Sequence, residues 1–281
     1  MRVALSHALF SIMNSSSIPK AFSSLGCHEL TLMETLDLAE RHGIGAVEVR
    51  SLEGTTDLPA VLARAYGSPA VLAGQLRGRR VRILALDTSL GLVTPSTADR
   101  EAFLACVAWA EALGVAWLRA FDGGKNPSDN GPADAAATMR WWREQRQQHG
   151  WRTDVMVETH DTLLTAETVL RFCDLVPGAA ILWDSHNTWR KANTDPVTMW
   201  RAIGSHVVHV HVKDSVSRPS GQFPYTYVLP GEGEFPMARL LDALRADHYA
   251  GAVSLEWERQ WHPSLPPLED ALRSAAGKNW W

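Results

Sequence analysis

Cysteine, net positive charge and long apolar runs are all scarce in this chain of 281 residues. The three cysteines, Cys27, Cys106 and Cys173, lie far apart and form no C-x-x-C pair, which argues against a disulfide framework or a zinc knuckle. The formal net charge of −4 argues against a protein that binds the phosphate backbone of nucleic acid. We therefore expect reduced thiols and no nucleic-acid partner.

The hydrophobic segments are short. No run of about 18 apolar residues occurs, so we expect no membrane-spanning helix. The first ten residues, MRVALSHALF, reach polar side chains after only a few apolar ones, which is too soon for a signal peptide. These features favour a cytoplasmic protein that has no membrane partner.

Short apolar strands alternate with amphipathic helices, and no linker is long enough to separate two domains. This order predicts an α/β fold, a single (β/α)8 TIM barrel over residues 1–281. The predicted strands are Val3–Ser6, Ala46–Val49, Val81–Leu86, Ala116–Arg119, Thr153–Glu158, Ala180–Asp184, His206–His211 and Ala252–Glu256. The main predicted helices are Leu32–His42, Leu58–Tyr66, one capped by Ser96 or Thr97, Ala133–His149, Thr165–Leu175, one after Asp195, and Pro236–Asp247. The proline- and glycine-rich segment Ser215–Phe235 is expected to form a lid over the mouth of the barrel.

Four apolar strands in the second half end in a carboxylate or an imidazole, and intervals of 26, 27 and 45 residues separate these end residues. Successive βα units produce such intervals, with one enlarged loop before the last strand. Because the carboxyl ends of parallel strands meet at one end of a barrel, the side chains should lie together. Three carboxylates and one imidazole are a mostly hard donor set, suited to Mn²⁺, Mg²⁺ or Co²⁺. The candidate metal ligands are Glu158, Asp184, His211 and Glu256.

Any one of these residues alone would more often be a surface or salt-bridged side chain. Four of them at the same end of consecutive strands are harder to explain without a cation, because an unpaired buried charge costs several kcal/mol. His209 and Glu258 compete with His211 and Glu256 for the ligand positions. Alternation along a strand does not decide between them, since each pair shares a strand face.

These segments, together with G-I-G-A-V-Glu48-V-Arg50, L-G-V-A-W-L-Arg119 and P-G-Glu232-G-Glu234, resemble the xylose-isomerase-like TIM-barrel family of sugar isomerases and epimerases. The resemblance covers nearly the whole chain. The family patterns H-x-K-D and S-L-E-W imply that His211 and Glu256 are the ligands.

The resemblance implies a divalent-metal-dependent isomerase or epimerase of a keto-sugar or related polyol. Mn²⁺ is the expected ion, with Mg²⁺, Co²⁺ or Zn²⁺ as alternatives. In related epimerases the two metal-bound glutamates face opposite sides of the substrate. Glu158 and Glu256 would then remove and return a proton through a metal-stabilised enediolate.

Three other functions are compatible with the same frame. A lyase or dehydratase acting on an inosose or a 3-oxo-glycoside would expel a β-oxygen from the same enolate. An abasic-site endonuclease-like hydrolase would need further histidine ligands on the early strands, which end near Glu48 and Asp87. An inactive sugar-binding barrel is the non-enzyme alternative, and a homo-oligomer is left open.

Other residues near the predicted mouth are assigned by position. His186 and Lys213 are expected to take part in catalysis, although related ketose epimerases have Asp-x-x-His where this chain has Asp-Ser-His-Asn. The residues expected to contact substrate are His7, His160, Trp189 and Trp257. A charged layer inside the barrel is expected from Glu48, Arg50 and Arg119.

Overall fold

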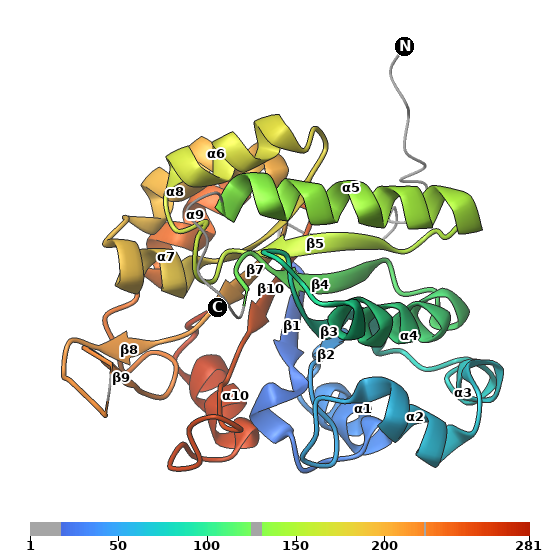
Figure 1. Cartoon of the computed structure of the whole chain (residues 1–281). Coiled ribbons are helices and arrows are strands. Elements are labelled where there is room, and N and C mark those ends of the chain that lie inside the picture. Colours follow the sequence, from blue (N-terminus) through green and yellow to red (C-terminus); the bar gives the residue numbers. More distant parts are fainter. Residues whose placement is uncertain (1–17, 125–130, 222) are drawn as a thin grey trace.

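The computed structural model describes residues 18–124, 131–221 and 223–281. Within these ranges eight parallel strands close into a barrel in the order β1-β10-β7-β6-β5-β4-β3-β2. The strands lie at the centre and the helices surround them (Figure 1). The barrel strands are β1 (Lys20–Ser23), β2 (Ala46–Val49), β3 (Arg82–Gly91), β4 (Trp117–Phe121), β5 (Asp154–Glu158), β6 (Ala180–Asp184), β7 (Val207–Val212) and β10 (Ala252–Leu255). The predicted (β/α)8 barrel is confirmed.

The strand predictions hold to different degrees along the chain. Strands β2 and β6 have the predicted bounds, whereas β3 continues to Gly91, well beyond the predicted end at Leu86. The residues after Leu86 are polar, yet Thr88 is buried and its Oγ1 donates to the Arg119 carbonyl oxygen. The predicted strand Val3–Ser6 and His7 lie outside the described residues. The first barrel strand is β1, which pairs with β10 and β2.

The helices described are α1 (Leu32–Arg41), α2 (Leu58–Tyr66), α3 (Pro69–Gln75), α4 (Thr97–Leu113), α5 (Gly131–His149), α6 (Ala166–Leu175), α7 (Ser185–Ala192), α8 (Pro196–Ile203), α9 (Met237–Ala246) and α10 (Leu268–Gly277). Short polar side chains begin several of them. Thr31 and Ser96 each accept a hydrogen bond from the third residue of the helix, whose carboxylate bonds back to the cap. None of the helices in the described ranges is long and apolar enough to cross a membrane.

Two of these helices, α3 and α7, were not predicted. Helix α7 follows β6 with no loop, and Asp184 is both the last residue of the strand and the N-cap of the helix. Its Oδ1 accepts from the Asn187 backbone N–H at 2.8 Å. Helix α7 is hard to predict from the sequence for two reasons. Its eight residues are mostly polar, and its N-cap, Asp184, is also the last residue of a strand.

The inward face of the barrel changes from apolar to charged along β5 and β6. Side chains two residues apart share a strand face. Met156 and Leu182 form a buried apolar cluster with Ala85, and each is followed two residues later by a candidate ligand. Glu158 and Asp184 therefore lie above an apolar layer, at the carboxyl end of the barrel.

The predicted lid, Ser215–Phe235, contains a small antiparallel pair, β8 (Ser215–Val216) and β9 (Thr226–Tyr227). This pair projects from the barrel beside β7 (Figure 1). The Asp214 carboxylate accepts backbone N–H groups from Gly231, Gly233 and Phe235 at 2.8 to 3.1 Å. The segment is thus folded back onto the residue that precedes it.

Asp122 organises the loop that follows β5. Its buried carboxylate accepts the backbone N–H groups of residues 160–163 at 2.7 to 3.0 Å. We expect Asp122→Ala to lower the free energy of unfolding by at least about 3 kcal/mol, because several buried donors lose their acceptor. Urea unfolding would measure this. The exposed Asp174 on α6 is the control, and equal changes in Asp122→Ala and Asp174→Ala would contradict this account.

Candidate metal centre

Four buried side chains meet at the carboxyl end of the barrel. Each offers one donor atom, and these atoms lie within 4.8 Å of one another. They come from the ends of β5 and β6, from β7, and from the residue after β10. The residues are Glu158, Asp184, His211 and Glu256.

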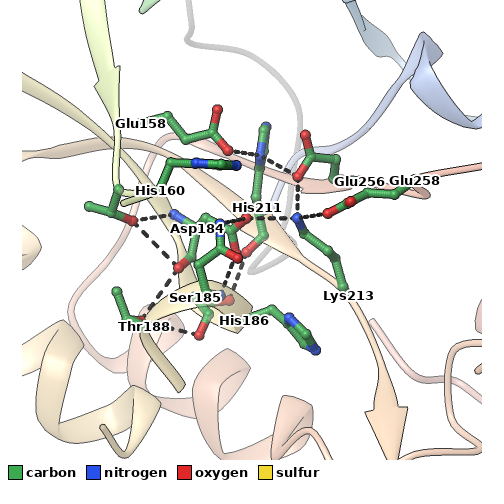
Figure 2. A network of polar contacts seen from close by, with 12 residues as sticks. Glu158, His160, Asp184, Ser185, His186, Thr188, His211, Lys213, Glu256 and Glu258 are labelled. Carbon is green, nitrogen blue, oxygen red and sulfur yellow. Dashed lines mark hydrogen bonds and ion pairs between the residues drawn. The ribbon is translucent and has the colours of Figure 1, made fainter. Parts of the chain in front are cut away.

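His211 lies between the two glutamates of this group (Figure 2). Its Nδ1 is 3.7 Å from Glu158 Oε1 and 3.2 Å from Glu256 Oε2. The Nδ1 atom and Glu158 Oε2 are buried and make no hydrogen bond. Three buried carboxylates that converge on one imidazole suit a divalent ion, since like charges buried together are costly unless a cation lies among them. The residues present therefore fit a divalent metal ion.

Lys213 supplies positive charge to the same group. Its Nζ lies 2.8 Å from Asp184 Oδ2 and 2.5 Å from both Glu256 Oε2 and Glu258 Oε1. Burial would lower the pKa of Lys213, but these carboxylates raise it well above its usual value. In turn, Lys213 and His211 hold the pKa of Glu256 well below its usual range despite burial. Glu256 is consequently ionised.

A different cationic side chain keeps Glu158 ionised. Arg119 Nε, from β4, lies 3.3 Å from Glu158 Oε2, and both side chains are buried. Burial opposes ionisation, yet the guanidinium lowers the pKa of Glu158 below its usual value. The two glutamates beside His211 are thus both carboxylates at neutral pH.

The competing residues lie outside the group of four. Glu258 contacts Lys213, and its Oε1 also accepts a hydrogen bond from the Tyr227 hydroxyl at 3.1 Å. His209 Nε2 lies 3.0 Å from Glu48 Oε1. Glu48, His209 and His211 together make a second candidate metal-binding group. The ligand role of the first group remains a prediction.

The three residues of the expected charged layer contact different partners. Glu48 contacts the two histidines of β7, and Arg119 contacts Glu158. Arg50 donates to Ser89 Oγ at 3.0 Å and to the Asp87 carbonyl oxygen. The sequence signal for Glu48 was a lone carboxylate inside the apolar strand Ala-Val-Glu-Val.

The other predicted site residues occupy varied places. His186 is fully buried in the first turn of α7, with Nε2 2.8 Å from Ser215 Oγ, and its ring points away from the group of four (Figure 2). Trp257 is 1% exposed, and its Nε1 donates to the Pro266 carbonyl oxygen. Trp189 packs against Phe235 and under the Arg190 guanidinium. The structure does not bring these three into the group.

His160 is better placed to meet a substrate. It follows Glu158 by two residues and lines a cavity of about 340 Å³ together with Ser89 and Phe121. Its Nδ1 lies 2.9 Å from Asp161 Oδ1, and its ring contacts Phe121 edge to face. This cavity is open at the same end of the barrel as the candidate metal centre.

Two tyrosines of the predicted lid were missed by the sequence analysis. The rings of Tyr225 and Tyr227 pack against His186, and their hydroxyls are 3.4 Å apart. Through its hydrogen bond to Glu258, Tyr227 ties the lid to the carboxylate that contacts Lys213. The spacing of two between the tyrosines was visible, but their partners follow from the fold of the loop.

The sequence matches the model of the protein family described as Xylose isomerase-like TIM barrel over residues 36–278. None of the curated proteins compared with this chain matches it.

Several solved structures share the fold. A probable 3-DHS dehydratase, AsbF, involved in petrobactin synthesis in Bacillus anthracis, is 17% identical with a TM-score of 0.74, over 92% of this chain and 97% of that one. The IolI protein with a bound zinc atom is 19% identical with a TM-score of 0.74, over 93% and 96%. A D-psicose 3-epimerase solved with D-fructose is 15% identical with a TM-score of 0.65, over 93% and 98%. At these identities the likeness concerns the fold.

We expect the protein to bind one divalent ion per chain and to gain thermal stability from added Mn²⁺ by mass action. Asp184→Ala and His211→Ala should abolish both effects, because each removes a donor from the group of four. Glu258→Gln is the matched control, since Glu258 lies outside that group, and it should retain the ion. Metal analysis and thermal unfolding would measure this, and unchanged metal content in Asp184→Ala and His211→Ala would contradict the proposed site.

Proposed function

Because the chain belongs to the xylose isomerase-like TIM-barrel family, we propose that it is a divalent-metal-dependent isomerase or epimerase of a keto-sugar or related polyol. The observation that carries the proposal is the group of four buried donors, Glu158, Asp184, His211 and Glu256. When bound there, the ion would polarise a substrate carbonyl and acidify the neighbouring C–H bond.

The two glutamates are the proposed bases. Both are held ionised, Glu158 by Arg119 and Glu256 by Lys213 and His211. They lie on either side of the His211 ring nitrogen (Figure 2). In the proposed reaction one glutamate takes the proton from the carbon next to the carbonyl, and the other returns a proton to the opposite face of the resulting enediolate.

Lys213 is the proposed electrostatic partner of the developing oxyanion. Its ammonium is buried among three carboxylates, so its charge acts in surroundings that screen it weakly. His160, beside the open cavity, is proposed to contact a substrate hydroxyl. The proposed partner is therefore a small sugar or polyol.

The proposed ion is Mn²⁺, since three of the four donors are carboxylates. Mg²⁺, Co²⁺ and Zn²⁺ are the alternatives, and the zinc atom in the IolI structure supports Zn²⁺ among them. A cytoplasmic location is proposed as well, since free, buried cysteines are compatible with a reducing compartment.

A lyase is the second candidate. His160 follows the proposed base Glu158 by two residues, and Asp161 raises the pKa of the His160 imidazole despite burial, so a proton donor stands near that base. Proton delivery to a β-oxygen would release it as water or an alcohol and leave an unsaturated ketone. The fold likeness to a probable dehydratase agrees with this alternative.

NMR of candidate ketoses and inososes in D₂O, with the metal-loaded protein, separates these functions. An isomerase or epimerase exchanges the α-proton and produces a new stereoisomer or isomer. A lyase releases a hydroxyl or aglycone instead. A metal-loaded protein that neither exchanges nor converts a broad panel of such sugars would count against both proposals.

Substitution of the two bases tests the assignment of their roles. Glu158→Gln and Glu256→Gln should retain some metal, because an amide oxygen still coordinates weakly. Turnover should fall by about 10²- to 10⁴-fold, the usual contribution of a positioned acid or base. One variant is expected to exchange the α-proton with D₂O without completing epimerisation. Near-normal turnover in both variants would refute the two-base assignment.

A further inference from the structure

The carboxylate of Glu48 reaches across the barrel interior to two histidines. Glu48 belongs to β2, and His209 and His211 belong to β7, which is separated from β2 in the barrel by β1 and β10. Glu48 Oε2 lies 2.8 Å from His211 Nε2, and Oε1 lies 3.0 Å from His209 Nε2. Glu48 is 0% exposed, so water does not compete for these contacts.

This contact leaves only one ring nitrogen of His211 free to bind a cation. An ionised carboxylate only accepts hydrogen bonds, so the Nε2 atom facing Glu48 must carry a proton. The other nitrogen, Nδ1, is buried, makes no hydrogen bond and faces Glu158 and Glu256. The second nitrogen of a metal-binding histidine is commonly held by a carboxylate, which fixes both the tautomer and the orientation of the ring.

We propose that Glu48 is a positioning residue that holds the Nε2–H form of His211 and thereby directs Nδ1 to the divalent ion. The proposal rests on the proposed metal centre and adds a residue that does not itself bind the ion. His209 contributes by engaging the second oxygen of Glu48, which keeps the carboxylate from turning away from His211.

The neighbouring acid Asp87 provides a matched control. It is 0% exposed and lies in the same barrel interior, but its two carboxylate oxygens have no hydrogen-bond partner. Burial, followed by the nearby charge of Glu48, raises the pKa of Asp87 to about 8. Asp87→Asn at pH 7 therefore exchanges one mainly neutral group for another and leaves the contact between Glu48 and His211 in place.

The test compares the affinity of metal-free protein for Zn²⁺, by competition with a chelating dye, in wild type, Glu48→Leu, Glu48→Gln and Asp87→Asn. Loss of a carboxylate that orients a metal-binding histidine typically weakens metal binding by roughly 10- to 100-fold, and we expect this for Glu48→Leu. Glu48→Gln should recover most of the affinity, since an amide oxygen still accepts from Nε2–H. Asp87→Asn should bind like wild type.

Nitrogen-15 NMR of histidine-labelled, Zn²⁺-loaded protein provides a readout that a loss of stability would not move. For His211 we expect a protonated Nε2 and a metal-bound Nδ1 in the wild type. If Glu48→Leu fails to fold, His209→Leu provides the test. It should keep this protonation pattern at His211 but bind Zn²⁺ less tightly than wild type.

Three results would overturn the proposal. They are a Zn²⁺ affinity of Glu48→Leu equal to that of wild type, a metal-bound Nε2 on His211, or a second ion per chain held by Glu48 and His209. A wild-type protein that binds no divalent ion would instead refute the proposed metal centre, and the positioning role with it. The failures of the two proposals are thus distinguishable.

Discussion

The structure depends on how a barrel interior accommodates several buried carboxylates. Glu48, Glu158, Asp184 and Glu256 are each at most 5% exposed. Burial of an ionised carboxylate is strongly unfavourable unless positive charge or hydrogen-bond donors surround it. The chain meets this requirement with positive or proton-bearing groups from other strands, chiefly Arg119, Lys213 and the two histidines of β7.

The same compensation would stabilise these carboxylates when the proposed ion is not bound. Lys213 Nζ contacts oxygens of Asp184 and Glu256, two of the four candidate ligands. Burial would lower the pKa of His211, but the charges of Glu48 and Glu256 raise it well above its usual value, so His211 also carries positive charge beside the carboxylates. A divalent ion would compete with these charges for the same oxygens. Metal binding is then expected to release a proton from His211, because a coordinating nitrogen needs its lone pair.

The sequence predicted the barrel and the grouping of four polar side chains at its carboxyl end because both depend on local patterns. A buried strand that ends in Glu158 or Asp184 is visible as an apolar run followed by a carboxylate, and parallel strands bring such ends together. The contact between Glu48 and His211 was beyond reach, since it joins residues that are 163 apart in the chain across the barrel interior. The burial of Trp257 and of the His186 ring was missed for a related reason. The loops and helices around a residue beside a candidate ligand decide whether its side chain faces the site or packs elsewhere in the protein interior.

The most direct measurement is anomalous diffraction at the manganese edge from crystals of the protein loaded with Mn²⁺. The account predicts a single strong peak per chain, bounded by oxygens of Glu158, Asp184 and Glu256 and by Nδ1 of His211. A peak between Glu48, His209 and Nε2 of His211, or no peak at saturating Mn²⁺, would contradict it.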